Sequence, residues 1–253
     1  MRESKRTILF LVLGSFFIAN AIIAEFVGVK IFSVEDTLGI KPFAITLFGD
    51  SYSFNMTAGV LLWPVVFIMT DIINEYFGKH GVRLFSYIAA ALISYAFIAV
   101  YTTIQVAPAG FWLIKETPEG PLNMQAAFSS IFGQGMWIIV GSLVAFLIGQ
   151  LIDVYVFHQI KLRTGDKALW LRSTGSTLVS QFIDSFVVLI IAFYIGGNWP
   201  LKLVIAVGVV NYIYKFAVAV VLTPLLYIVH SIIDNYLGKE LAAQMLREAA
   251  AEE

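Results

Sequence analysis

The stretch Trp63-Pro-Val-Val-Phe-Ile-Met-Thr-Asp-Ile-Ile-Asn-Glu-Tyr-Phe-Gly78 carries the main signal of this sequence, because it places charges at the end of an apolar run that opens at Met56. Four polar residues interrupt the run: Thr70, Asp71, Asn74 and Glu75. Carboxyl groups at membrane depth are costly, so they usually serve a function. Residues four apart share one side of a helix, and these side chains therefore predict a polar binding site at membrane depth. The alternative interpretation is a helix end, with Asp71 paired to a base and Gly78 stopping the helix near water.

The composition argues against a soluble domain and predicts an all-α integral membrane protein. Hydrophobic residues make up 59% of the 253 residues and charged residues only 13%, whereas a soluble domain carries about 25% charge. Several runs of about 20 apolar residues have the length of a transmembrane helix. The net charge of −1 gives no indication of nucleic-acid binding, and the absence of cysteine excludes disulfides, thiol catalysis and thiolate metal sites.

Six apolar segments are long enough to cross a membrane, at residues 7–32, 56–77, 84–106, 134–158, 173–195 and 201–229. We expect them to form a single six-helix transmembrane domain over residues 1–230, followed by a cytoplasmic C-terminal tail over 231–253. Pro64 predicts a kink in the second segment. In the longest connection, residues 124–132 form a short amphipathic patch, which predicts a helix lying on the membrane surface or a cap over a cavity.

The distribution of basic residues predicts the orientation. Six spans place both termini on one side of the membrane. The termini and the connections after the second and fourth spans hold eleven bases: Arg2, Lys5, Arg6, Lys79, Arg83, Lys161, Arg163, Lys167, Arg172, Lys239 and Arg247. The opposite connections hold three: Lys41, Lys115 and Lys202. Because basic residues concentrate on the cytoplasmic side, both termini are predicted to be cytoplasmic. Two halves of three spans with inverted topology remain an open alternative, with Asp71 and Asp184 as counterparts.

Three further spans carry polar residues on one helix face. In the fifth span the polar stripe is Ser173, Thr177, Gln181 and Asp184, in the fourth it is Gln150 and Asp153, and in the sixth it is Asn211 and Lys215. The stripes of the fifth span and of the second predict one shared polar pocket. The pair in the fourth span lies nearer the cytoplasmic end, where pairing with Arg163 or Lys215 is the alternative to a place in the pocket.

The predicted spans contain more acids than bases. The acids are Glu25, Asp71, Glu75, Asp153 and Asp184, and the bases are Lys30 and Lys215. Buried carboxyl groups without a basic partner take up a proton, contact water, or bind a cation or a hydrogen-bond donor. The cavity therefore favours donor-rich or cationic solutes. A guanine-like edge, which presents a ring N–H beside an amino group, fits this chemistry, and so do a cationic amine and protons.

We expect no metal and no cofactor. His80, His158 and His230 are dispersed without the spacing of metal ligands, and the chain has no glycine-rich phosphate loop. An intramembrane aspartyl protease using Asp71 and Asp184 is disfavoured, because neither residue has the Tyr-Asp or Gly-x-Gly-Asp context of that class.

At these residues the sequence resembles a known family, the queuosine precursor transporters, which are also called the vitamin uptake transporter family. Four pieces carry the resemblance: Pro64-x5-Thr70-Asp71 with Asn74-Glu75-Tyr-Phe-Gly78; Gly149-Gln150-x2-Asp153-x3-Phe157; Ser173-Thr-Gly-Ser-Thr177-x3-Gln181-x2-Asp184; and Asn211-Tyr-x2-Lys215 ahead of Pro224. They extend over nearly all six spans and are jointly far more specific than any one of them.

The resemblance implies a multi-pass protein of the cell's inner (plasma) membrane that transports a small molecule and is not an enzyme. The implied substrates are 7-deazaguanines that are precursors of the tRNA nucleoside queuosine: 7-cyano-7-deazaguanine, its 7-aminomethyl relative, or queuine. It also implies similarity to the six-helix substrate-binding subunits of energy-coupling-factor vitamin importers. The implied partners are the substrate and the lipid bilayer, without nucleic acid, and a homo-oligomer is compatible with the sequence.

These inferences assign roles to the polar residues. The predicted substrate-binding residues are Asp71, Asn74, Glu75, Thr177, Gln181, Asp184 and Asn211, with Asp71 or Asp184 accepting from the guanine edge. The predicted charge partners or coupling residues are Lys215, Asp153, Gln150 and Glu25. A proton-coupled cycle through Asp71 or Asp184 is a further hypothesis. The alternatives to an importer are a binding subunit that needs a separate energising partner and a proton- or cation-conducting protein.

Overall fold

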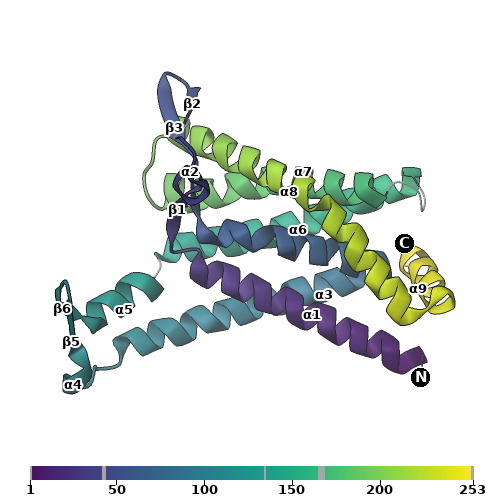
Figure 1. Cartoon of the computed structure of the whole chain (residues 1–253), viewed down its shortest axis with the longest axis horizontal. Helices are drawn as coiled ribbons and strands as arrows, with labels where there is room; N and C mark the ends of the chain where they lie inside the picture. Colours follow the sequence, from purple (N-terminus) through teal and green to yellow (C-terminus); the bar gives the residue numbers. More distant parts are fainter. Residues whose placement is uncertain (1, 42–43, 134, 165–168, 252–253) are drawn as a thin grey trace.

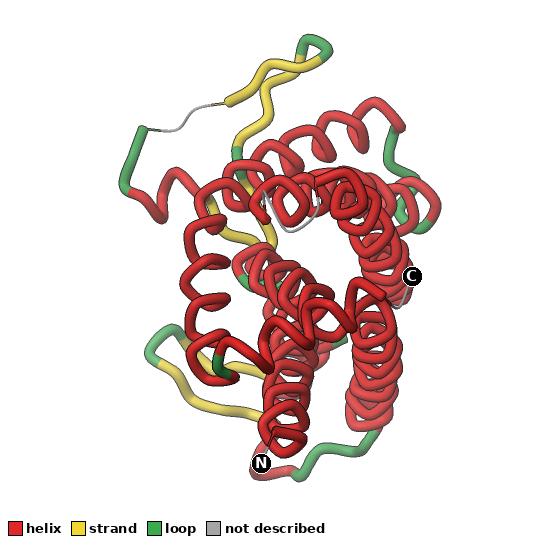
Figure 2. Tube along the Cα trace, turned by 90° about the vertical axis from the view of Figure 1, so that its right-hand side faces the viewer, coloured by secondary structure: helices red, strands yellow, loops and turns green. Residues whose placement is uncertain are grey.

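The computed structural model describes residues 2–41, 44–133, 135–164 and 169–251. Five helical stretches in this part are long and apolar enough to cross a membrane: Glu3–Val27, Trp63–Gln105, Met124–Thr164, Trp170–Ile195 and Leu201–Leu237. They lie side by side as an elongated bundle (Figures 1 and 2). The prediction of an all-α membrane protein is confirmed at this level. Two predicted features, Gln134 at the start of the fourth span and Lys167, lie outside the described residues.

The bundle is built from α1 (Arg2–Val27), α3 (Trp63–Gln105), α6 (Met136–Thr164), α7 (Leu169–Leu189), which the π-helical turn η2 (Ile190–Ile195) extends, and α8 (Leu201–Leu237). Its main apolar core contains Phe17 of α1, Ile73 of α3 and Phe146 of α6, all fully buried. Much of the outer surface is apolar as well, as expected for helices that face lipid instead of water.

A bend at Gly78 divides α3 into two parts. Gly78 has φ 66° and ψ −175°, a backbone conformation that only glycine adopts without strain. In Figure 1 the chain turns back at this bend, so that the two parts of α3 run in opposite directions. The parts before and after Gly78 correspond to the second and third predicted spans.

The start of α3 differs from the prediction. Residues Asn55–Thr57 form the strand β4, and the 3-10 helix η1 (Ala58–Leu61) follows before α3 begins at Trp63. Pro64 therefore lies in the first turn of α3, where its missing N–H has no helical acceptor to lose. The predicted kink at Pro64 is wrong, and the predicted second span begins several residues too early.

Short strands and helices gather at one end of the bundle, which we call the hairpin end (Figure 1). They are β1 (Ile31–Ser33), α2 (Val34–Leu38), β2 (Ala44–Leu47), β3 (Asp50–Ser53), α4 (Gly110–Leu113), β5 (Ile114–Thr117), β6 (Gly120–Asn123) and α5 (Met124–Phe132). Antiparallel pairing joins β1 to β4, β2 to β3 and β5 to β6. The amphipathic patch predicted at residues 124–132 forms α5, and the Asn123 side chain caps its N-terminus.

The opposite end, which we call the α9 end, holds both the start of α1 and the last helix, α9 (Lys239–Ala251) (Figure 1). Helix α9 packs Leu241, Ala242 and Met245 into the main core. Arg6 forms an ion pair with Glu248 at 2.6 Å. Gln244 and Arg6 donate to the Glu248 carboxylate and hold its pKa below the usual range.

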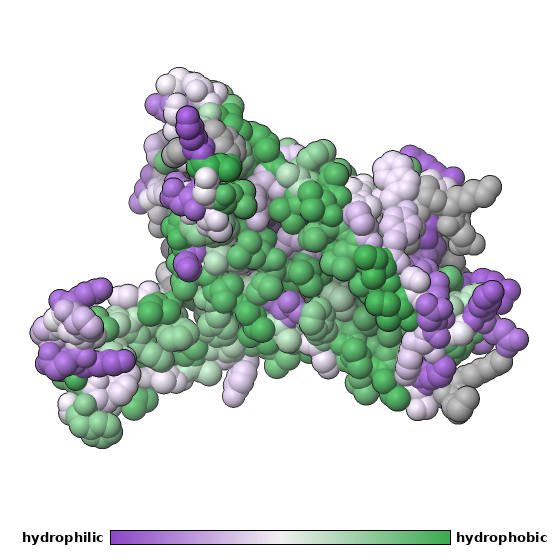
Figure 3. All heavy atoms as spheres, in the orientation of Figure 1, coloured by the Kyte–Doolittle hydropathy of each residue, from purple (hydrophilic) through white to green (hydrophobic). Residues whose placement is uncertain are grey.

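The surface separates apolar and polar residues along the bundle axis. Hydrophobic residues cover its middle in Figure 3, and hydrophilic residues concentrate toward the hairpin end and the α9 end. This is the surface of a helix bundle that spans a bilayer, with polar groups left outside the hydrocarbon region.

Candidate functional site

A pocket opens between α3, α7 and α8, and the empty space within it together with the open space at its mouth comes to about 410 Å³. Its polar lining is Asp71, Ser173, Thr174, Thr177, Gln181, Lys215 and Thr223, and its apolar lining is Pro64, Ile68, Ala219, Leu222 and Leu226. Four of the predicted site residues therefore line one cavity: Asp71, Thr177, Gln181 and Lys215. Ser173, on the predicted stripe of the fifth span, joins them.

Asp71 reaches the pocket from the first part of α3, where it is 2% exposed. The hydroxyl of Ser173 donates a short hydrogen bond to Asp71 Oδ2, and Thr177 Oγ1 approaches the same oxygen at 3.5 Å. Ser173 and Thr177 are four apart on α7, so one face of that helix holds the carboxyl group. The other oxygen, Oδ1, has no hydrogen-bond partner among the described residues. It is a buried acceptor whose hydrogen-bonding capacity is unused in this part of the chain.

Two buried amide side chains also leave hydrogen-bonding atoms unused within the described part of the chain. Gln181 lines the pocket, and its Oε1 has no partner there. Asn74 lies one turn after Asp71 on α3 and leaves its Nδ2 group without a partner. Buried polar groups normally find partners, so these atoms suggest a polar ligand or water.

An ion pair joins α7 and α8 beside the pocket. Lys215 Nζ donates to Asp184 Oδ2 at 2.5 Å, with the side chains 10% and 19% exposed. Asp184 itself is not among the lining residues, although its partner is. Lys215 thus has the predicted role of a charge partner, and the acid that it contacts is Asp184.

Gln150 and Asp153 on α6 contact hydroxyl groups of α3 and α7. Thr70 donates to Gln150 Oε1 at 2.8 Å, and Ser180 donates to Asp153 Oδ1 at 2.9 Å. The predicted pairing of Asp153 with Arg163 or Lys215 is therefore wrong, because Asp153 contacts the hydroxyl group of Ser180 instead.

Glu25 and Asn211 lie outside the pocket lining. The carboxylate of Glu25, in α1, accepts a hydrogen bond from Ser142 of α6 at 2.9 Å. Asn211 is half-buried on α8, one turn before Lys215.

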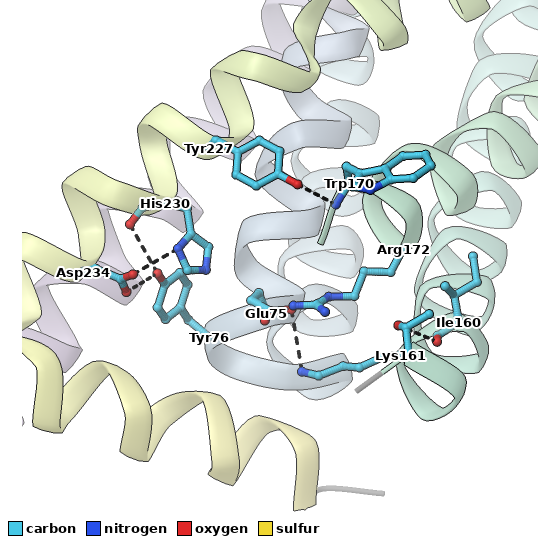
Figure 4. Close-up of polar contacts among 10 residues, drawn as sticks. Glu75, Tyr76, Ile160, Lys161, Trp170, Arg172, Tyr227, His230 and Asp234 are labelled. Atoms are coloured by element: carbon cyan, nitrogen blue, oxygen red, sulfur yellow. Dashed lines mark hydrogen bonds and ion pairs between the residues drawn. The ribbon is translucent and has the colours of Figure 1, made fainter. Parts of the chain in front are cut away.

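Glu75 has two basic partners that the sequence interpretation assigned to a loop (Figure 4). Arg172 contacts both carboxylate oxygens, at 2.5 Å and 3.2 Å, and Lys161 Nζ lies 3.7 Å from Oε2. All three side chains are buried. The predicted count of two bases, Lys30 and Lys215, does not describe the interior of the bundle. Lys161 and Arg172 are buried there as well, because α6 continues to Thr164 and α7 starts at Leu169, and Lys30 is exposed.

A second cluster at the α9 end holds α8 against α3 and α7 (Figure 4). Tyr76 donates to Asp234 at 2.7 Å, and His230 lies 3.1 Å from the same carboxylate. Tyr227 accepts from the backbone N–H of Trp170 at 3.2 Å. This cluster was not predicted, because the expected sixth span ended at residue 229, whereas α8 continues to Leu237.

Comparison with known proteins identifies the family. The family described as "Putative vitamin uptake transporter" matches residues 57–229. A "Probable queuosine precursor transporter" of Bacillus subtilis is 29% identical over 74% of this chain and 76% of its own length. A protein of Haemophilus influenzae with the same name is 24% identical over 72% and 73% of the two chains. The "Queuosine precursor transporter" of Escherichia coli is 26% identical over 75% and 77%.

No solved structure matches the chain significantly. The family match covers the motifs on which the resemblance rested, so that prediction is confirmed. Together with the apolar helices it indicates a multi-pass membrane transporter and not an enzyme. The chain belongs to the vitamin uptake transporter family.

Proposed function

We propose that this protein imports 7-deazaguanine precursors of queuosine and binds them in the pocket between α3, α7 and α8. The observation that carries the proposal is the buried Asp71 carboxyl group, which lines the pocket and leaves one oxygen without a partner among the described residues. The names of three relatives point to the same class of substrate.

The recognition chemistry follows from the unused atoms. The edge of a 7-deazaguanine presents a ring N–H beside an amino group, and both are donors. Asp71 Oδ1 and Gln181 Oε1 are acceptors that lack partners in the described structure. The hydroxyl of Thr177 complements a remaining acceptor of the ring. Asn74 is not among the lining residues, so in this proposal its amide nitrogen borders the site and does not contact the substrate. Asp71 has this role instead of Asp184, because Lys215 already occupies the Asp184 carboxylate.

In this proposal Glu75 supports the site and does not contact the substrate. Its carboxylate is held by Arg172 and Lys161, one helix turn from Asp71 toward the α9 end. Asn211 and Glu25 lie outside the lining. Asn211 lies one turn before Lys215 on α8, and Glu25 contacts Ser142 of α6.

The proposed topology has six crossings with both termini in the cytoplasm. The bend at Gly78 supports six crossings, because it separates two antiparallel parts of α3. The α9 end carries bases such as Lys79, Arg163 and Lys239, which are typical of a cytoplasmic face. We also propose a similarity to the binding subunits of energy-coupling-factor importers and the formation of a homo-oligomer.

Binding of 7-cyano-7-deazaguanine to the purified protein tests the ligand and the pocket together. We expect binding by the wild type and a loss of about 10- to 150-fold in Asp71→Asn, because a hydrogen bond to a charged group contributes about 1.5–3 kcal/mol. Asp50→Asn is the matched control, since Asp50 is an exposed acid at the hairpin end. Isothermal titration calorimetry provides the measurement.

The outcomes separate the two parts of the proposal. Equal affinity in Asp71→Asn and wild type would place the substrate elsewhere. A folded wild type that does not bind would exclude this class of ligand. Uptake by the purified chain alone in liposomes distinguishes an importer from a binding subunit, because a binding subunit transports only with its energising partner.

A further inference from the structure

The pairing of charges within the bundle leaves two acids that only hydroxyl groups contact among the described residues. Glu75 has Arg172 and Lys161, and Asp184 has Lys215. Asp71 and Asp153 are in a different situation. The partners that the structure gives them are the hydroxyls of Ser173, Thr177 and Ser180, all from α7.

One face of α7 connects these two acids. Thr177 approaches Asp71 and, three residues further along, Ser180 donates to Asp153 at 2.9 Å. Residues three apart on a helix are neighbours on its surface, so the two carboxyl groups lie along the same short stripe. Both are buried, at 2% and 0% exposure, and each keeps one oxygen without a partner in the described structure.

An unsatisfied amide marks the same place independently. Gln150 lies one helix turn before Asp153 on the same face of α6 and is 1% exposed. Its Oε1 accepts from Thr70, the residue next to Asp71, while its Nε2 has no partner among the described residues. Gln150 and Thr70 therefore connect the surroundings of Asp153 with those of Asp71. We call this group of buried polar side chains the polar compartment.

The charged groups around this compartment are engaged elsewhere. From α3 it is faced by Glu75, which Arg172 of α7 and Lys161 of α6 neutralise. From α7 and α8 it is faced by the Asp184–Lys215 pair. From α1 comes Glu25, whose carboxylate accepts from Ser142. No basic side chain in the described structure lies within ion-pair distance of Asp71 or Asp153, and two buried carboxyl groups without a basic partner favour the uptake of a proton or another small cation.

We propose that Asp71 and Asp153 form a proton-binding site that couples transport to a pH gradient. The coupling rests on the proposed import of 7-deazaguanines, whereas the proton site itself does not. The substrate binds while Asp71 is ionised, and the proton that accompanies it is held on Asp153. Substrate and proton cross together, and on the cytoplasmic side the substrate leaves Asp71 and the proton leaves Asp153 to water. The empty site takes up the next proton on the outer side, so that one proton enters with each substrate. A proton suits the site because each carboxyl group binds a hydroxyl donor on one oxygen and has the other oxygen available to carry it.

Infrared spectroscopy of the purified protein tests the proton site without any substrate. The carbonyl stretch of a protonated carboxyl group is separate from the bands of a carboxylate. We expect a pH-dependent band in the wild type that Asp153→Asn removes and the exposed-site control Asp50→Asn keeps. Ser180→Ala, which leaves both acids in place, should shift the pH at which the band titrates. Spectra of Asp153→Asn and wild type that agree over the whole pH range would overturn the site.

Uptake into proteoliposomes tests the coupling. With an acidic exterior, we expect the wild type to accumulate 7-cyano-7-deazaguanine and Asp153→Asn to accumulate at least ten-fold less. The variant should still exchange labelled for unlabelled substrate, because Asp153 does not line the pocket. Accumulation driven by a sodium gradient and indifferent to pH would overturn the coupling. A wild type that keeps the Asp153-dependent band without binding the substrate would overturn the proposed function and leave the proton site standing.

Discussion

Glu75 lies one turn after Asp71 on α3, yet the two carboxyl groups have different surroundings. Arg172 holds Glu75 with two hydrogen bonds and Lys161 adds a second positive charge, so this acid is neutralised inside the bundle. Asp71 faces hydroxyl groups and the pocket. Glu75 therefore holds α3 against α7, whereas Asp71, one helix turn earlier, can accept a hydrogen bond in the pocket.

This contrast predicts the effect of removing Arg172. Arg172→Gln should destabilise the protein by about 3 kcal/mol, because breaking a buried ion pair leaves a charge with a weaker partner. Lys161, at 3.7 Å, compensates only in part. Glu75→Gln should destabilise the protein more than Arg172→Gln, because it takes the acid away from two buried bases, whereas Arg172→Gln keeps the Glu75–Lys161 pair. Thermal unfolding in detergent measures both, and an Arg172→Gln variant that unfolds at the wild-type temperature would contradict the structural role of this pair.

At the scale of elements, the close contact between η1 and α1 sets the entry of the chain into α3. A Cβ atom on Gly59 would lie 2.7 Å from the carbonyl oxygen of Ala24 and 3.5 Å from Cα of Gly28. Both neighbours are backbone atoms, which cannot rotate away as a side chain can. Glycine at position 59 therefore permits the packing that positions Pro64 and the first turns of α3.

Gly59→Ala is expected to push η1 away from α1 and to cost about 1–3 kcal/mol, as overpacking of a tight contact does. Gly110→Ala is the matched control, because a Cβ atom there meets nothing within 4 Å. Unfolding temperatures of the two variants give the comparison. Equal stability of both would show that the η1–α1 contact adjusts freely.

The whole molecule separates its charges along the bundle axis, and the proposed orientation follows from this separation. The chain has no cysteine, so single cysteines report on one position each. Ser51, in strand β3 of the β2–β3 hairpin, and Gln244, on α9, are exposed residues at opposite ends of the bundle.

We expect a membrane-impermeant maleimide to label Ser51→Cys from outside intact cells and to label Gln244→Cys only after the cells are opened. The physical reason is the excess of bases at the α9 end, which keeps that end in the cytoplasm. Labelling of Gln244→Cys in intact cells would show that the orientation is the opposite of the proposed one. Labelling of both from one side would contradict the placement of the two ends across the membrane.

The helical class, the family and part of the pocket lining could be predicted from the sequence. Hydrophobicity is a local property, so runs of apolar residues reveal helices wherever they lie in the fold. The amphipathic pattern of residues 124–132 predicted α5 with its observed bounds for the same reason. Helical spacing also placed Thr177, Gln181 and Asp71 on faces that meet in one pocket.

The choice of partner for each acid was decided only by the tertiary structure. Arg172 is 97 residues from Glu75 and lies in what hydropathy reads as a loop, because a buried ion pair lets a helix extend past the end of its apolar run. Lys215 pairs with Asp184 and leaves Asp71 to hydroxyl groups. Spacing along one helix tells which side chains share a face, but the pairing of charges depends on distances between helices, which the packing of the whole bundle determines.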